Sequence, residues 1–335
     1  MPLSDASPQT SITEMLANLN ILWILFIVAG LTVVRLALIK VPTPTARSIA
    51  EILESGMIAI AMVFLIIRPF ILQAFFIPSP SMEPTLLGKN NSGDRILVNK
   101  FVYRLGKPAR DNVVVFLAPP AAMAGNPEFI KRLIGLPGDK LESVGGKVIV
   151  NGTAYYHAEI REKLALDGDF GPDAQSAPDG DLQADHHVKF VEGGVLADNH
   201  LIPVSRLAEI LTGQKDLPAS VSPGYNILNG QRLKEPFIAE DPDYDMKIYH
   251  GFPIKHEHDG GMDEYKWDMQ ALSPADFAQK FALPTEALPA NHYMMMGDNR
   301  NDSNDSTNWG PLESWRVVGR AQIIFWPPSR IGLIR

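Results

Sequence analysis

Residues 112–118 read NVVVFLA, a short run rich in β-branched residues. Runs of this kind, separated by turn-forming Gly, Pro, Asn and Asp, are typical of β-strands. The same pattern recurs in RILVNKF (95–101), KVIVNG (147–152), HYMMM (292–296) and RAQIIFW (320–326). The sequence therefore predicts a mainly β fold with antiparallel strands over the region that follows residue 77.

A hairpin is predicted within LESVGGKVIVNG (141–152), where Gly145-Gly146 separates two extended runs and Asn151-Gly152 closes the second. Residues 153–290 have scattered charges and few long apolar runs. We interpret them as a large inserted lobe, β-rich with irregular loops, in which we predict no site. The β domain itself would comprise residues 78–152 and 291–335.

Two apolar stretches precede the β region. Residues 19–39 form a run of 21 residues with a single charge, Arg35, which is long enough to cross a hydrocarbon core of about 30 Å. A second stretch covers residues 55–77 and is interrupted at Arg68-Pro69. We expect two transmembrane helices here, joined by a loop at residues 40–54. A cleaved signal peptide and a buried helix are the respective alternatives for the two stretches.

The orientation in the membrane follows from the positive charges. Arg35, Lys40 and Arg47 lie at or between the two stretches, whereas residues 1–18 contain no Lys or Arg. Positive residues stay in the cytoplasm. The short N-terminus at residues 1–18 and everything after residue 77 would therefore be extracytoplasmic.

The composition excludes several kinds of site. The chain has 30 Lys+Arg against 38 Asp+Glu, a formal charge of −8, with no dense basic cluster, so we expect no nucleic acid partner. It has no cysteine, which excludes disulfides, thiol nucleophiles and Cys-based zinc sites. We interpret His186, His187, His256 and His258 as solvated loop histidines. The segment DGDFGPD (167–173) begins like a calcium loop but is not followed by its pattern, because the sixth place has no Gly and the twelfth has no Glu. No metal and no cofactor are predicted.

Three segments carry candidate chemistry: FFIPSPSMEPTL (75–86), FIKRLIGLPGDK (129–140) and MGDNRNDSNDS (296–306). Each alone is compatible with an ordinary loop or turn. Together, and in this order, they resemble the bacterial type I signal peptidases (leader peptidases), a serine protease family with a Ser/Lys dyad. The matching motifs are SPSMEPTL (79–86), GDRILV (93–98), KRLIGLPGD (131–139) and GDNR (297–300).

The resemblance implies that Ser81 is the nucleophile and Lys131 its general base. A lysine accepts a proton only when it is neutral, and its ordinary pKa is about 10.4. Apolar neighbours such as Phe129 and Ile134 predict that desolvation lowers the pKa of Lys131. Alternation along a strand would direct Arg132 to the opposite face.

Supporting roles are implied in the same way. Ser79 matches the residue whose hydroxyl joins the Ser81 backbone N–H in the oxyanion hole, and Ser303 matches the serine that orients the lysine. Arg132 is expected to pair with Asp298. The remaining implied positions are charged supports at Arg300 and Asp305, and pocket-lining side chains at Phe75, Ile77 and Ile130.

The sequence departs from the family at Thr307, where an arginine is usual. Asp305 would then lack its usual salt-bridge partner. We expect Thr307→Arg to change activity little, because an exposed ion pair contributes only about 0 to 1 kcal/mol.

The implied activity is removal of signal peptides from exported preproteins, with cleavage after small-x-small sites. The implied location is the bacterial inner (plasma) membrane, with a multi-pass anchor and the catalytic domain on the periplasmic side. Membrane lipid and the protein export machinery would be neighbours. Two alternatives are a self-cleaving repressor with the same dyad, disfavoured by the two membrane segments, and an inactive β scaffold, disfavoured by the intact Ser81, Lys131 and Ser303.

Overall fold

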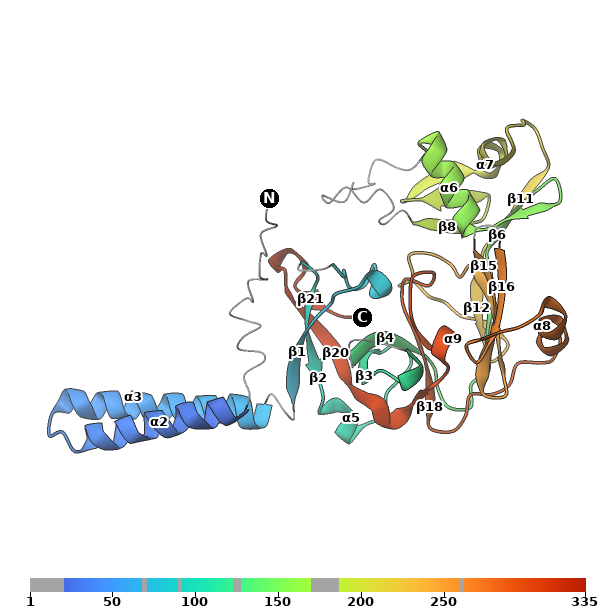
Figure 1. Ribbon diagram of the computed structural model, residues 1–335. Coiled ribbons are helices and arrows are strands. Elements are labelled where there is room, and N and C mark those ends of the chain that lie inside the picture. The colour runs from blue at the N-terminus through green and yellow to red at the C-terminus, as the bar shows by residue number, and fades with distance from the viewer. Residues whose placement is uncertain (1–20, 68–70, 90–91, 123–127, 170–186, 260–261) are drawn as a thin grey trace, which may run out of the picture.

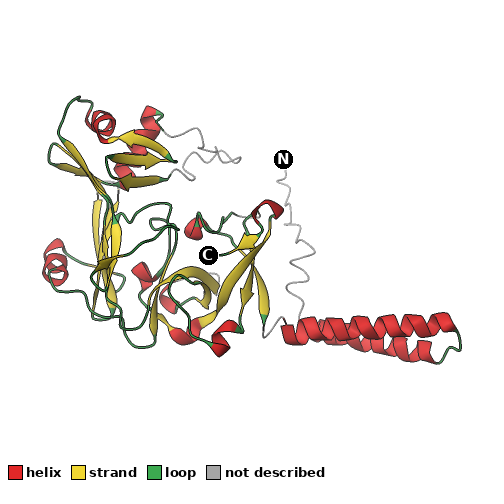
Figure 2. Cartoon of the chain, turned by 180° about the vertical axis from the view of Figure 1, so that it is seen from behind, coloured by secondary structure: helices red, strands yellow, loops and turns green. Residues whose placement is uncertain are grey.

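The computed structural model describes residues 21–67, 71–89, 92–122, 128–169, 187–259 and 262–335. Figure 1 shows a β-rich body from which a helical hairpin projects on one side, with a small lobe at the far end; Figure 2 shows the same arrangement from behind. The fold is mainly β and its sheets are antiparallel, as predicted.

Among the described residues, the first sheet has eight strands in the order β1-β2-β20-β3-β4-β18-β19, with β21 beside β20. The bounds are β1 (Leu72–Phe76), β2 (Arg95–Asn99), β3 (Val113–Leu117), β4 (Glu128–Gly135), β18 (His292–Met296), β19 (Leu312–Glu313), β20 (Val317–Trp326) and β21 (Gly332–Leu333). Strands β2, β3, β18 and β20 confirm four of the strands predicted from the sequence.

The central strand β3 is apolar throughout because both faces of the sheet are covered. Val113 and Val115 contribute to one buried cluster, whereas Val114 and Phe116 contribute to another on the opposite face. A strand buried on both faces reads as a continuous apolar run rather than an alternating one. The neighbouring strand β4 is therefore held in a water-poor environment at its inner end, where residues 131–135 are buried.

A second sheet of the described residues has seven strands in the order β13-β12-β5-β14-β15-β16-β17. The bounds are β5 (Leu141–Val144), β12 (Tyr225–Leu228), β13 (Gln231–Arg232), β14 (Tyr244–Tyr249), β15 (Phe252–Asp259), β16 (Met262–Trp267) and β17 (Gln270–Ala271), with helix α8 (Pro274–Phe281) after them. The two sheets share one core, since Ile134 and Met294 of the first pack with Leu141 and Met246 of the second.

The far lobe has its own core. It contains β6 (Lys147–Val150), β7 (Thr153–Tyr155), β8 (Val188–Val191), β9 (Gly194–Ala197), β10 (His200–Pro203) and β11 (Ala219–Ser222), with helices α6 (His157–Asp167) and α7 (Val204–Thr212). Buried side chains from both helices and from strands β6, β8, β9 and β10 form one apolar cluster. Residues 153–290 thus supply most of this lobe, apart from β6, and most of the second sheet (Figure 1).

The prediction of a hairpin within residues 141–152, with its turn at Gly145-Gly146, is wrong. Strand β5 pairs with β12 and β14, whereas β6 pairs with β7 and β11, so the chain changes sheets at Gly145-Gly146. A Cβ on Gly146 would lie 2.2 Å from both Asp241 Oδ2 and a ring carbon of Phe190, which explains why glycine is needed at the crossing. The Asn151-Gly152 turn does close a hairpin, between β6 and β7.

The helical hairpin consists of α2 (Ile21–Ile39) and α3 (Pro44–Ala61), and a π-helical turn follows at Met62–Ile67. Thr43 caps α3 by accepting from the Ala46 N–H, and Pro44 occupies its first turn. The helix expected at 55–77 is therefore displaced: it begins at Pro44, within the predicted loop 40–54, and residues 72–76 form strand β1 instead. Over the described residues, neither helix has the combination of length and hydropathy that a membrane span requires. The two predicted transmembrane helices are not confirmed.

Short helices complete the described chain. They are the 3-10 turns at Pro80–Met82, Pro120–Ala122, Ser314–Arg316 and Pro328–Arg330, and the single-turn helices α5 (Val102–Leu105) and α9 (Ser306–Trp309).

Candidate active site

Ser81 lies in the 3-10 turn at Pro80–Met82, in the connection between β1 and β2. Pro80 fixes the backbone at the start of the turn, and Ser79 before it is extended, with φ −127° and ψ 153°. The two hydroxyls face each other, with 3.3 Å between Ser79 Oγ and Ser81 Oγ. Gly88 packs directly beneath this turn, because a Cβ at that position would lie 1.6 Å from the Ser79 carbonyl oxygen. The serine is therefore held by close backbone packing.

Lys131 extends from β4 to the serine. Its Nζ donates to Ser81 Oγ across 2.6 Å, and both residues are buried. Burial lowers the pKa of Lys131 from 10.5 to about 8, against the opposing field of Asp305, Asp298 and Asp302. The predicted desolvation is present, and a substantial fraction of this amine is neutral near pH 8.

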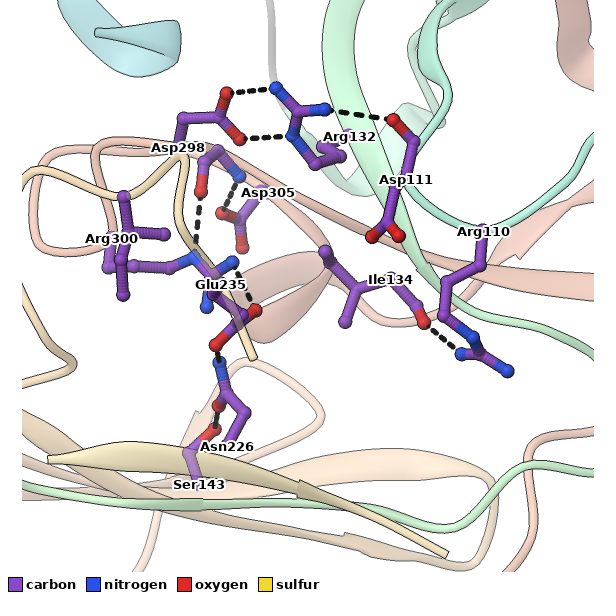
Figure 3. A network of polar contacts seen from close by, with 12 residues as sticks. Arg110, Asp111, Arg132, Ile134, Ser143, Asn226, Glu235, Asp298, Arg300 and Asp305 are labelled. Atoms are coloured by element: carbon purple, nitrogen blue, oxygen red, sulfur yellow. Dashed lines mark hydrogen bonds and ion pairs between the residues drawn. The ribbon is translucent and has the colours of Figure 1, made fainter. Parts of the chain in front are cut away.

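Arg132, the next residue on β4, forms the expected ion pair with Asp298. Its Nε donates to Oδ1 at 2.7 Å and its second terminal nitrogen to Oδ2 at 2.6 Å, with both side chains fully buried (Figure 3). The guanidinium also donates to the backbone carbonyls of Asp111 and Arg335, and it lies 4.0 Å from the centre of the Phe237 ring. Because the guanidinium makes hydrogen bonds to several groups, this buried ion pair fixes the position of the loop after β18 relative to β4.

That loop, residues 297–305, is anchored by Asp305. Its Oδ2 accepts the Gly297 N–H at 2.8 Å, and its Oδ1 accepts both the N–H and the hydroxyl of Thr307 at 2.9 and 2.8 Å. Asp305 thereby caps α9, and Thr307 is its partner in place of an arginine. Both residues are buried, so Thr307→Arg would place its charge inside the protein rather than form an exposed ion pair.

Ser303 lies close to the dyad, but its hydroxyl makes no hydrogen bond within the described part of the chain. A Cβ on Gly297 would meet Ser303 Oγ at 2.3 Å and the Ser81 carbonyl oxygen at 2.5 Å, so Gly297 separates these two serines. The role of Ser303 in orienting Lys131 stays a prediction.

Arg300 has a partner that the sequence did not reveal. Its Nε donates to the Gly297 carbonyl at 2.9 Å, and a terminal nitrogen donates to Glu235 Oε1 at 2.6 Å. Glu235 belongs to the inserted residues 153–290 and follows β13 of the second sheet. Glu235 in turn accepts from Asn226, which accepts from Ser143 on β5 (Figure 3). No local pattern marks Glu235, because it lies 65 positions before Arg300 in an irregular segment.

An apolar cavity of about 390 Å³ opens beside the serine. Its wall includes the three pocket residues implied by the resemblance, Phe75, Ile77 and Ile130, together with Ser79, Ser81 and Lys131. The lining also includes the carboxylates of Glu128 and Asp302, which were not predicted from the sequence as pocket residues. A nucleophile with a partly deprotonated base at the edge of a small apolar cavity is suited to acyl transfer on a substrate with small side chains.

The signal peptidase family, peptidase S26, matches residues 49–202 and 225–326 of the chain. The chain belongs to this family. The two matched segments include the serine turn, the lysine strand and the loop after β18, so the family match and the geometry concern the same residues.

Curated relatives are similar along most of their length. The signal peptidase I of Leptolyngbya laminosa is 25% identical over 297 residues, covering 88% of this chain and 85% of the relative. That of Aquifex aeolicus is 29% identical over 283 residues, covering 82% and 83%. That of Buchnera aphidicola is 43% identical over 279 residues, covering 79% and 73%.

Proposed function

We propose that this chain is a serine endopeptidase that removes signal peptides from exported preproteins, with Ser81 as the nucleophile and Lys131 as the general base. The contact of 2.6 Å between Lys131 Nζ and Ser81 Oγ, in a buried site next to an apolar cavity, is the observation that carries the proposal. Membership of the signal peptidase family supplies the substrate class.

The chemistry follows from the protonation state of Lys131. Once the amine is neutral, the same contact reverses, and Nζ accepts the Ser81 proton while Oγ attacks the scissile carbonyl carbon. The C–N bond breaks, the proton passes from Nζ to the leaving amine, and an acyl-enzyme remains. Water then attacks the ester with Nζ again as base, which releases the cleaved signal peptide and regenerates Ser81.

Ser79 and the backbone N–H of Ser81 would stabilise the oxyanion. The position of the Ser79 hydroxyl, 3.3 Å from Ser81 Oγ, supports this role, because a donor beside the nucleophile faces the charge that develops during attack. Arg132, Asp298 and Arg300 would act as positioning residues, since their buried ion pairs hold β4 and the loop that packs on it.

The cavity fits the small residues that precede a signal peptide cleavage site. Phe75, Ile77 and Ile130 line it, and their bulk leaves a shallow apolar space that suits alanine-sized side chains. Cleavage after small-x-small sequences is therefore the proposed specificity.

The helical hairpin would anchor the enzyme in the bacterial inner membrane, with the protein export machinery nearby. Many of its large apolar side chains are exposed, including Trp23, Phe26 and Ile52, and lipid would cover them. Arg35 is paired with Glu54 across the hairpin at 2.6 Å, which reduces the cost of placing its charge in an apolar medium.

A fusion experiment tests the proposed topology, in which residues 78–335 lie outside the cytoplasm. A reporter that is active only in the cytoplasm, fused after Arg335, should stay silent, while the same reporter fused within the loop between α2 and α3 should be active. Strong activity of the fusion after Arg335 would reverse the orientation.

The dyad is tested with a purified preprotein and the detergent-solubilised chain. Ser81→Ala and Lys131→Arg should both abolish cleavage, because a guanidinium stays protonated and cannot accept the serine proton. Lys255→Arg is the matched control, since Lys255 is also buried but lies on β15, outside the cavity. Near-normal turnover by Lys131→Arg would exclude Lys131 as the base and leave the family membership intact.

A further inference from the structure

Two histidines and one aspartate gather on one face of the second sheet. His256 and His258, interpreted from the sequence as loop residues, lie on β15. Residues two apart on a strand point to the same face, and Asp245 of β14 is directly opposite His256 in the ladder. The three side chains thus converge from two hydrogen-bonded strands, and none of them is among the described residues that line the active-site cavity.

Their ligand atoms are close enough to share one ion. One nitrogen of each imidazole and one oxygen of Asp245 all lie within 4.8 Å of one another, and His258 Nε2 is 3.6 Å from Asp245 Oδ2. Ligands of a tetrahedral metal at about 2.0 to 2.1 Å are themselves about 3.3 Å apart. Small side-chain rotations would bring the three groups to that spacing.

Aromatic rings hold both imidazoles in place. Tyr265 stacks on His256 with 4.3 Å between ring centres, and Tyr156 stacks on His258 at 3.8 Å with the rings nearly parallel. Asp245 is oriented by its other oxygen, Oδ1, which accepts the Gly145 N–H at 2.9 Å. Contacts of this kind fix the direction of a ligand side chain. They raise metal affinity because the side chain then loses less conformational freedom on binding.

The charges also favour a cation on this face. The nearby lysines, Lys255 and Lys266, both contact Glu257 at 2.6 Å, and alternation places Lys255 and Glu257 on the opposite face of β15. Asp245, His256 and His258 therefore share the face of the sheet that these basic side chains do not occupy.

We propose that Asp245, His256 and His258 form a binding site for a divalent transition metal of the zinc class, with water completing the coordination. Imidazole nitrogen is a ligand for zinc, copper and nickel, whereas magnesium and calcium select oxygen-rich sites. The ion would connect β14 to β15. Through the Tyr156 ring on His258, it would also stiffen the start of α6, which immediately follows Tyr156, and with it the junction between the second sheet and the far lobe.

Direct metal titration tests the site on the full detergent-solubilised chain, prepared without a histidine tag and freed of metal with a chelator. The wild type should bind one equivalent of Co²⁺ with visible ligand-field bands, and Zn²⁺ should displace it. His256→Gln and Asp245→Asn should weaken binding at least about 100-fold, more than the loss of a mere orienting contact. His250→Gln is the control, because His250 is exposed and lies outside the cluster.

Two further measurements guard against variants that fail to fold. Urea unfolding midpoints in chelator should match for wild type and variants, and Zn²⁺ should raise the midpoint of the wild type and of His250→Gln only. X-ray absorption of the Zn²⁺-loaded wild type needs no variant and should show two imidazole ligands at about 2.0 to 2.1 Å. A metal shell without imidazole, an absence of Co²⁺ bands, or equal binding by His256→Gln would overturn the proposal.

Discussion

At the scale of single residues, the central feature is a lysine held between two opposing effects. Burial favours the neutral amine of Lys131, whereas the carboxylates of Asp305, Asp298 and Asp302 favour its ammonium form, and burial prevails. A general base works best when its pKa lies near the working pH. The surrounding carboxylates therefore limit how far the pKa falls and keep it at about 8.

This balance predicts a pH dependence of stability. The pKa of Lys131 falls from 10.5 to about 8 on folding, so the unfolded chain binds an extra proton between these values and stability rises with pH across that window. Below pH 8, burial of the ammonium costs about 3 kcal/mol. Lys131→Met should therefore be about 3 kcal/mol more stable than wild type at pH 7, and the difference should vanish above pH 10.5.

Urea unfolding at a series of pH values measures this effect, with Ser81→Ala as an inactive control that keeps the lysine and should keep the slope. Cleavage by the wild type should rise through a pH near 8 as the amine loses its proton. A Lys131→Met variant no more stable than Ser81→Ala at pH 7 would contradict the lowered pKa of Lys131.

At the scale of elements, the serine turn depends on a close backbone contact. Gly88 approaches the Ser79 carbonyl so closely that no Cβ fits, and Asp94 ties the following segment by accepting the Leu87 N–H at 2.8 Å. Arg330, near the C-terminus, donates to the same carboxylate at 2.9 Å. The turn is thus positioned by contacts from both ends of the β domain.

Gly88→Ala should therefore displace the serine turn and reduce turnover by about 100-fold or more, because a misplacement of about 1 Å in a reacting group has effects of that size. Gly56→Ala is the matched control, since a Cβ at Gly56 in α3 meets nothing within 4 Å. Preprotein cleavage by the two variants provides the comparison. Equal activity would mean that the turn accommodates the methyl group and that Gly88 does not position Ser81.

At the scale of the whole molecule, the inserted residues are part of the support of the active site. Glu235 is buried against Arg300, which holds the Gly297 carbonyl of the catalytic loop. Removal of one partner from a buried ion pair leaves an uncompensated charge. The insertion therefore supplies the counter-charge that the loop after β18 needs.

Glu235→Ala should lower the free energy of unfolding by about 3 to 5 kcal/mol, the usual effect of breaking a buried pair. Glu313→Ala is the control, because that glutamate pairs with Arg316 at a site where its side chain is 46% exposed, and an exposed pair contributes about 0 to 1 kcal/mol. Urea denaturation measures both. Similar small losses in the two variants would contradict a supporting role for Glu235.

Local sequence predicts the β class and the two residues of the proposed dyad. The apolar runs at 95–101 and 112–118 predicted strands because side-chain burial follows directly from pattern. The motifs at 79–86 and 131–139 singled out Ser81 and Lys131 through their resemblance to a known family, whereas the contact between the two residues depends on how the turn after β1 packs against β4. A Ser/Lys dyad needs one particular residue type at each of two positions, and the motifs around those positions can be recognised in the sequence itself.

The contacts between groups that are distant in the chain depend on the three-dimensional fold. Glu235 opposite Arg300 and Asp245 opposite His256 depend on strand register and loop path, which no local pattern encodes. The change of sheet at Gly145-Gly146 requires a glycine because Asp241 and Phe190, which are distant in the sequence, pack directly against Gly146. The contact of Thr307 with Asp305 is local to the cap of α9, but its burial comes from the core that packs around the cap.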